Sequence, residues 1–140
     1  MSAETVRAVS VDRVGERRFR ARNVRGGELI FGEGEDADFT PVELLLTALA
    51  GCSAIDVDYL TTRRAEPESF EVDVRADKLS DEAGNHLGPI EVRFTVRFPD
   101  GPDGDRAREM LPTALRRSHD RLCTVSRSVE LGTPVTMVAD

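Results

Sequence analysis

The chain has 140 residues, of which 39% are hydrophobic, 32% are charged and 5% are aromatic, and its net charge is −7. This size and composition predict one soluble globular domain with a substantial core. The negative charge argues against a polyanionic partner, and the scarcity of aromatic residues argues against a stacking surface for single-stranded nucleic acid. We therefore expect no nucleic-acid partner.

The N-terminal segment has no apolar stretch, so the sequence predicts no signal peptide. The longest uncharged apolar run, from Leu44 to Ile55, is too short for a membrane span, which needs about 20 residues. Two cysteines without a secretion signal suit a reducing compartment, where a cysteine pair is more often redox-active than a structural staple. These features predict a cytoplasmic protein that does not span a membrane.

The first third of the chain has the pattern of a β-meander. The residues from Arg18 to Arg22 alternate strictly, which places three arginines on one strand face and Phe19 and Ala21 on the other. Glycines at 26 and 27 mark a turn, and an acidic, glycine-rich loop follows the third strand. The expected strands are 5–11, 18–22 and 28–31, and the loop is 32–36.

A well-marked helix start comes next. Thr40 is a good N-cap, Pro41 suits the first helical position, and Glu43 completes a Thr-x-x-Glu capping box. The helix is predicted to continue to about Thr62, and Pro67 prevents any extension. Because its central part is apolar all round, we expect it to be buried.

The rest of the chain predicts a hairpin and then two helical segments. Strands 70–75 and 90–98 alternate in polarity and are expected to pair across a turn at 81–86. Helices are expected at 106–122, bent by Pro112, and at 123–131, ended by Gly132, before a last strand at 134–138. The order βββ-α-ββ-α-α-β indicates a single α+β domain spanning residues 1–140.

Cys52 and Cys123 are the residues with the clearest chemical potential. One lies in each of two predicted helical regions, and packed helices can bring such thiols together. Inert core packing is the alternative, since free cysteine is among the most buried residue types. No Cys-x-x-Cys is present and only His86 and His119 could join as ligands, so a structural zinc site is not expected.

The neighbours of Cys52 leave several readings open. Cys52 lies far from the start of its own helix, so that helix dipole cannot lower its pKa by much, and a reactive thiolate needs a cation from elsewhere. At about 100° per residue, Glu43 faces away from Cys52 on the same helix. Any assistance that Glu43 gives to Cys52 must therefore come through another element or another chain. Asp56, one turn after Cys52, is either a buried anchor or the point where the helix meets water. His119 either touches Cys123 or is solvated.

Two segments carry a family resemblance. The segment from Phe39 to Val57, which includes Thr40-Pro41-Val42-Glu43 and Ala50-Gly51-Cys52, closely resembles the signature helix of the OsmC/Ohr family of thiol-dependent peroxidases and their relatives. Cys123-Thr124-Val125-Ser126 resembles that family's Cys-Pro-Val-Ser motif. Chain length and element order match over essentially the whole sequence. The resemblance implies an intertwined OsmC-like homodimer with active sites at the subunit interface.

The resemblance also implies roles for individual residues. Cys52 corresponds to the peroxidatic cysteine, Cys123 to the resolving cysteine, and Glu43 to the acid that orients an arginine. Some members hold that arginine in a stretch where this chain has none, between Gly26 and Glu43, and others hold it near the first hairpin. Of the hairpin arginines here, 13, 17 and 18, we select Arg18. Thr124 replaces the usual proline, which should loosen a helix start.

The function implied is a cofactor-free peroxidase that reduces organic hydroperoxides through a Cys52–Cys123 disulfide. A dithiol reductant, lipoyl-type in the family, would restore both thiols. The competing hypothesis is a non-catalytic, stress-associated or small-molecule-binding dimer with vestigial cysteines, which the unplaced arginine supports. A metal-binding module is a third class that the sequence does not favour.

Overall fold

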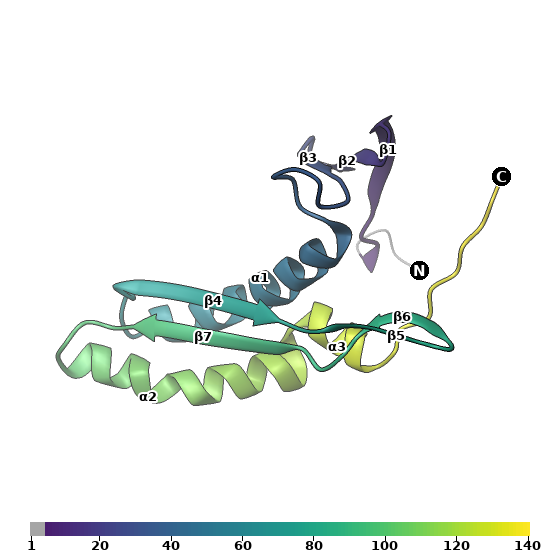
Figure 1. Cartoon of the computed structure of the whole chain (residues 1–140). Helices are drawn as coiled ribbons and strands as arrows, with labels where there is room; N and C mark the ends of the chain where they lie inside the picture. Colours follow the sequence, from purple (N-terminus) through teal and green to yellow (C-terminus); the bar gives the residue numbers. More distant parts are fainter. Residues whose placement is uncertain (1–4) are drawn as a thin grey trace. The chain divides into compact units, whose positions relative to one another are not determined.

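The structure is a computed structural model that describes residues 5–140, and the chain divides into two compact units, Met1–Leu45 and Leu46–Asp140. Its described part combines antiparallel strands with three α-helices (Figure 1). The predicted α+β class is therefore confirmed. The order of elements differs from the prediction at two places. An additional hairpin lies between the strands predicted at 70–75 and 90–98, and the C-terminal segment forms no strand.

The first unit contains a three-stranded antiparallel sheet in the order β1-β2-β3. Phe19 and Phe31 stack on it with ring centroids 6.0 Å apart, as the alternation of β2 predicts. Arg17 adopts a positive φ of 55° in the tight turn before β2. The strands are β1 (Val9–Gly15), β2 (Arg18–Asn23) and β3 (Glu28–Phe31), so β1 begins and ends later than predicted.

The acidic loop after β3 leads directly into α1 (Pro41–Thr62). The Gly32 N–H donates to the Phe39 carbonyl oxygen at 3.0 Å, which closes the loop. The predicted capping box is confirmed, because the Thr40 N–H donates to Glu43 Oε1 at 2.8 Å and the Glu43 N–H donates to Thr40 Oγ1 at 3.2 Å. The local sequence therefore fixes where α1 begins, and α1 ends at the residue predicted.

The second unit is built on the antiparallel pair β4 (Ser69–Arg75) and β7 (Glu91–Arg97). This pairing is as predicted, but the segment between the strands is not a simple turn. It forms a second hairpin, β5 (Lys78–Asp81) and β6 (Gly84–Leu87). Asp81 Oδ1 accepts the N–H groups of residues 83 and 84, a local turn signal strong enough to pair strands of low β-propensity.

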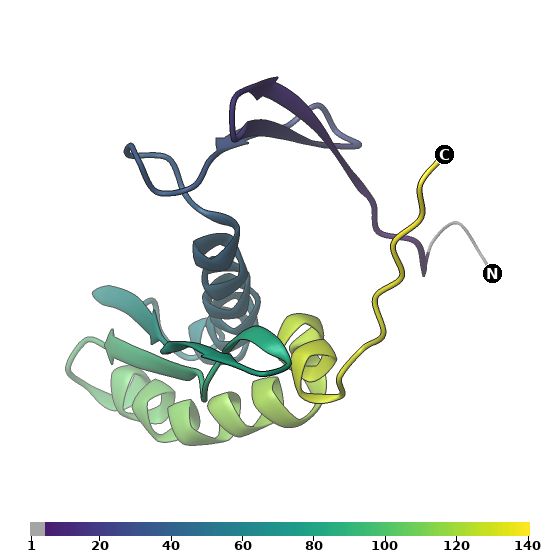
Figure 2. The same cartoon turned by 45° about the vertical axis from the view of Figure 1, so that its right-hand side comes forward.

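Helix α2 (Pro102–Arg117) runs along the β4–β7 pair (Figures 1 and 2). It starts earlier than predicted because proline at its first turn and two early aspartates favour a helix N-terminus. Gly104 packs so closely on the preceding loop that a Cβ there would lie 1.6 Å from the Pro99 carbonyl oxygen. Pro112 lies inside the helix without ending it.

A single turn of π-helix, η2 (Ser118–Leu122), separates α2 from α3 (Thr124–Glu130). Gly132, with φ 63°, follows α3 as predicted. The predicted final strand at 134–138 is wrong: residues 133–140 contain no strand, and Val135, Met137 and Val138 are 82%, 92% and 83% exposed. Among residues 5–140, this apolar segment pairs with no strand.

Helix α1 is much less covered than its composition predicts. Leu49, Val57 and Thr61 are its buried residues, whereas Ile55 is 61% exposed and Tyr59 is 69% exposed. The prediction of a helix buried all round is therefore wrong for a single chain. Among residues 5–140, α1 alone has the length and composition of a membrane span, a test that the core helix of a soluble protein also passes.

Candidate functional site

The second unit brings its two cysteines together. Cys52 lies within α1 and Cys123 lies where η2 meets α3, and both are free thiols. Cys52 and Cys123 lie close enough for each sulfur to shift the pKa of the other. Cys123 is fully buried, whereas Cys52 is partly exposed. The arrangement therefore offers one accessible and one protected thiol close to each other.

The π-turn sets the position of Cys123. The Cys123 N–H donates to the Ser118 carbonyl oxygen at 2.8 Å, the hydrogen bond that closes the wide turn. Arg127 on α3 donates to the Asp120 carbonyl oxygen at 2.9 Å and so ties α3 back to the same turn. Cys123 is itself the N-cap of α3, with an extended ψ of 100°. Thr124 thus starts an ordered helix without the proline of the family motif.

A polar bridge fixes the π-turn to α1. The hydroxyl of Ser118, a residue only 2% exposed, donates to Asp56 Oδ2 at 2.9 Å. Asp56 is half-buried and lies one helical turn beyond Cys52. Of the two readings that the sequence leaves open for Asp56, an anchor is observed, although its side chain is only half-buried. The bridge links the two cysteine-bearing segments, because the buried Ser118 hydroxyl keeps its acceptor only in this arrangement.

The surroundings of Cys52 favour its neutral thiol. Burial raises its pKa above the ordinary value, the backbone N–H of Val125 opposes this, and Cys123 and the Asp56 carboxylate raise the pKa further. Among the described residues, no cation is a main influence on this thiol. The Val125 amide lies in the first turn of α3. The donor that lowers the pKa of Cys52 therefore comes from a second helix and not from the N-terminus of α1.

For Cys123, the surroundings lower the pKa instead of raising it. Burial raises its pKa, but hydrogen-bond donors around the sulfur outweigh that effect and leave the pKa below the ordinary value. The Ser53 hydroxyl donates to Cys123 Sγ at 3.4 Å and the Ser126 N–H donates at 3.4 Å. The Ser126 hydroxyl and the Cys52 thiol lower the pKa as well. The pair therefore places negative charge more readily on the buried sulfur.

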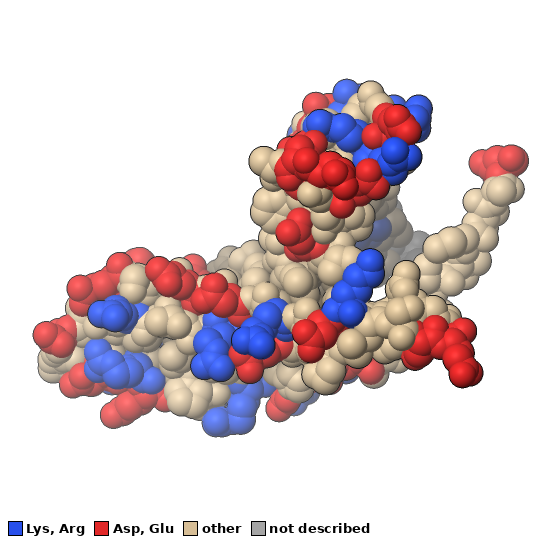
Figure 3. All heavy atoms as spheres, in the orientation of Figure 1, with Lys and Arg blue, Asp and Glu red and all other residues tan. Residues whose placement is uncertain are grey.

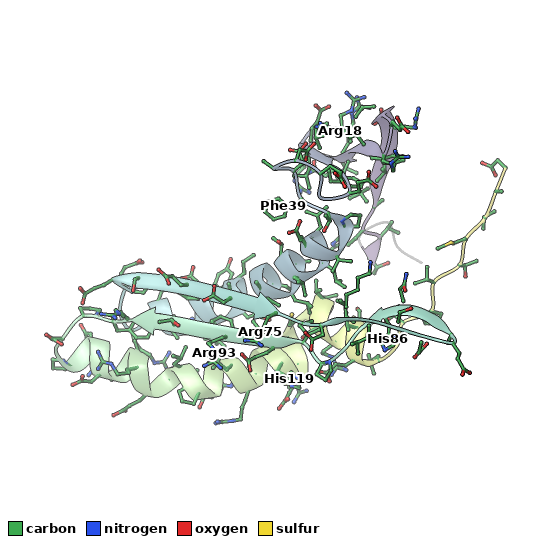
Figure 4. The ribbon with its side chains drawn as sticks, viewed as in Figure 1. Arg18, Phe39, Arg75, His86, Arg93 and His119 are labelled. Carbon is green, nitrogen blue, oxygen red and sulfur yellow. The ribbon has the colours of Figure 1, made fainter. Side chains whose placement is uncertain are left out.

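The two other predicted site residues belong to the first unit. Glu43 occupies the first turn of α1, where its carboxylate accepts the capping hydrogen bond. Arg18 binds Asp36 at 3.1 Å and Asp38 at 2.5 Å with its two terminal nitrogens. Figure 3 shows cationic and acidic side chains interspersed over this unit, and Figure 4 places Arg18 among them. The roles of Glu43 and Arg18 at a thiol remain predictions.

His119 is a solvated histidine and not a partner of Cys123. Its Nδ1 lies 2.8 Å from Asp120 Oδ1 and its Nε2 lies 2.8 Å from Glu130 Oε1 (Figure 4). The two carboxylates, Asp120 first, raise the pKa of His119 because the imidazolium can donate to both. The ion pair with Glu130 joins η2 to the end of α3. Among residues 5–140, no group of three metal-ligating side chains is assembled.

The raised pKa of His119 predicts a pH-dependent stability. A group with a raised folded-state pKa stabilises fully below its unfolded pKa, about 6.5, and loses that contribution as the pH rises through the folded value. The free energy of unfolding measured in urea should therefore fall as the pH increases across that window, by at most about 1 kcal/mol because the pair is exposed. His119→Gln should flatten this dependence. An equally steep profile in the variant would contradict the assignment.

Several residues of the site carry no recognisable signal in the sequence. In the sequence, Ser53 and Ser126 look like ordinary helix residues. Their convergence on the Cys123 sulfur depends on the packing of α1 against α3. Ser118 likewise gives no sign that it will bind Asp56. The position of Ser126, three residues after an N-cap cysteine, is the one local clue, since the N3 amide is the usual donor to a capping side chain.

The fold and the thiol pair define a class of small α+β proteins with two cysteines on packed helices. The model of the OsmC-like protein family matches residues 32–138, so the chain belongs to that family. An uncharacterized protein of Mycobacterium tuberculosis (strain ATCC 25618 / H37Rv) is 30% identical over 128 residues, covering 91% of each chain.

Two solved structures show the same fold. A hypothetical protein from Aquifex aeolicus VF5 superposes with a TM-score of 0.72 at 21% identity, covering 91% of this chain and 89% of its own. The organic hydroperoxide resistance protein OhrB of Bacillus subtilis superposes with a TM-score of 0.58 at 17% identity, covering 91% of this chain and 92% of its own. At these identities the likeness concerns the fold.

Proposed function

We propose that this OsmC-like protein is a cysteine peroxidase that reduces organic hydroperoxides in the cytoplasm. The observation that carries the proposal is the nearness of a partly exposed Cys52 thiol to a buried Cys123 sulfur, to which Ser53, the residue after Cys52, donates a hydrogen bond at 3.4 Å. A disulfide between the two cysteines is therefore the proposed intermediate. Membership of the OsmC-like family and the fold shared with the Bacillus hydroperoxide resistance protein add support.

The cycle proposed has three steps. The Cys52 thiolate attacks the outer peroxide oxygen, the O–O bond breaks, and the alkoxide takes a proton and leaves as an alcohol. Cys123 then attacks the resulting sulfenic acid, forming the disulfide and releasing water. An external dithiol, of the lipoyl type in the family, reduces the disulfide by thiol exchange and becomes a disulfide itself. No cofactor takes part.

The solvent exposure of each sulfur determines its proposed role in the cycle. Because Cys123 is 0% exposed, a peroxide meets Cys52 first. Leu49, one turn before Cys52 on α1, is buried and Ile55 is exposed on the same helix, and both favour an alkyl or aryl peroxide over hydrogen peroxide. The raised pKa of Cys52 in the single chain means that the attack requires a cation, for which Arg18, oriented by Glu43, is the proposed source.

The first test counts thiols after peroxide treatment. Reduced protein given excess cumene hydroperoxide should lose both thiols, and Cys52→Ser should keep its single thiol because the accessible nucleophile is gone. In Cys123→Ser the Cys52 sulfenic acid has no resolving partner and should oxidise further, which intact mass measures as added oxygen. If both wild-type thiols survive, the protein is the non-catalytic, small-molecule-binding alternative and its cysteines are vestigial.

The second test concerns Arg18 and Glu43. Arg18→Lys keeps the charge but loses the paired hydrogen bonds, and should reduce kcat/KM for cumene hydroperoxide by at least about tenfold. Glu43→Gln removes the charge while its amide oxygen can still cap α1, so its loss of activity should come without loss of stability. Arg17→Lys is the matched control, because Arg17 binds Glu33 in the same hairpin. Equal losses in Arg17→Lys and Arg18→Lys would exclude a specific role for Arg18.

We also propose that the protein is a single OsmC-like domain that works as an intertwined homodimer with its active sites at the interface. The exposed apolar side chains support this, since a soluble chain rarely leaves so many uncovered. They occur on the first strand, on α1 and in the C-terminal segment, and include Val9, Val11, Ile55, Tyr59, Val135, Met137 and Val138. A partner subunit would cover α1 and could supply Glu43 and Arg18 to a thiol.

Sedimentation tests this assembly. The native protein should sediment at twice the chain mass of 15.4 kDa. Ile55→Lys places a charge in the proposed interface and should weaken the dimer at least about tenfold, because an interface charge without a partner is costly to bury. Glu109→Lys, on an exposed polar position of α2 outside the proposed interface, should leave the dimer intact. A monomeric native protein would contradict the proposal.

A further inference from the structure

The sulfur of Cys123 lies in a cage of hydrogen-bond donors from two helices. The Ser53 hydroxyl on α1 and the Ser126 N–H on α3 each donate to it at 3.4 Å, and the neighbouring Cys52 thiol also lowers its pKa. A buried sulfur that accepts two such donors is suited to negative charge, because donors to the charged form stabilise it. Nothing comparable surrounds Cys52, for which the Val125 amide is the one donor among its main influences.

The hydroxyl of Ser126 is a further, incompletely used donor. Its oxygen is buried and has no hydrogen-bond partner in the part of the chain that the structure describes. It lies close enough to Cys123 to lower that pKa, although its present geometry falls outside that of a hydrogen bond. A buried hydroxyl without a partner is costly. Rotation toward a charged Cys123 sulfur would satisfy it, so the site is better satisfied with a thiolate than with a thiol.

We propose that Ser53 and Ser126 are positioning residues that make Cys123 the charge-bearing sulfur of the pair, so that a reductant opens the Cys52–Cys123 disulfide at Cys52 and releases Cys123 as a thiolate. This rests on the disulfide of the proposed function. The reductant thiolate attacks Cys52 Sγ, a new S–S bond forms there, and the Cys52–Cys123 bond breaks with its electron pair on Cys123. A second thiol of the reductant then frees Cys52.

Burial and leaving-group stability select the same direction. Cys123 is 0% exposed, so an incoming thiol reaches Cys52 first. The better leaving group in thiol exchange is the sulfur with the lower pKa, and the cage makes that sulfur Cys123. Asp56 is the charged group that faces the pair, and it raises the pKa of Cys52. His119, Asp120, Arg127 and Glu130 of the adjoining segments bind one another or the backbone.

The first arm of the test measures the acidity of Cys123 alone. In the Cys52→Ser protein, the ultraviolet absorbance of the thiolate is followed against pH. Adding Ser53→Ala should raise the pKa of Cys123 by about one unit, a tenfold loss of thiolate at a given pH, and Ser126→Ala should act in the same direction. Ser128→Ala, on α3 but outside the cage, should have no effect. Ser53→Thr, which keeps a hydroxyl, should restore the acidity and separates this role from a folding defect.

The second arm maps the point of attack. Diamide closes the disulfide without peroxide, a single equivalent of 2-mercaptoethanol opens it, and acid quenching followed by peptide mass locates the adduct. An adduct on Cys52 with Cys123 free is expected, and Ser53→Ala should slow its formation about tenfold. An adduct on Cys123, an unchanged pKa in both serine variants, or a disulfide that diamide cannot form would overturn the proposal. Opening at Cys52 in a protein that does not consume hydroperoxide would instead refute the proposed function alone.

Discussion

The chemistry of this protein depends on the contact between the middle of α1 and the N-terminus of α3. There Cys52 lies close to Cys123, the Val125 amide of α3 lowers the pKa of Cys52, and the Ser126 amide donates to Cys123. The Ser118–Asp56 hydrogen bond secures this contact from one turn away. Without it the π-turn could shift along α1, and neither sulfur would keep its donors. The packing of α1 against α3 therefore determines which donors lie near each sulfur.

The two sulfurs are chemically unequal because their exposures and donors differ. Cys123 combines complete burial with several donors, so that desolvation is offset and its pKa falls. Cys52 is more accessible but has fewer donors and a nearby carboxylate, so its pKa rises. In a lone chain the buried sulfur is therefore the more acidic of the two. An accessible nucleophile needs an additional cation, and this need connects the thiol chemistry to the proposed dimer.

The first unit follows closely from local sequence. The strict alternation of β2 fixes which side chains stack and which form ion pairs, and the capping box fixes the first residue of α1. The errors lie where local signals are weak or a partner is missing. The β5–β6 hairpin has poor strand formers and is held by the turn at Asp81, whereas the segment at 134–138 has good strand formers with no neighbouring strand in this chain.

The sequence by itself determined the α+β class, the ends of α1 and the family, because these depend on residue periodicity, capping and motifs that act over short distances. It also identified Cys52 and Cys123 as the candidate reactive residues. Only the tertiary structure decided that their thiols lie close together, that Ser53 and Ser126 converge on one sulfur, and that Asp56 is an anchor. Hydrogen bonds between residues remote in the chain depend on how helices pack, and no local pattern encodes that register.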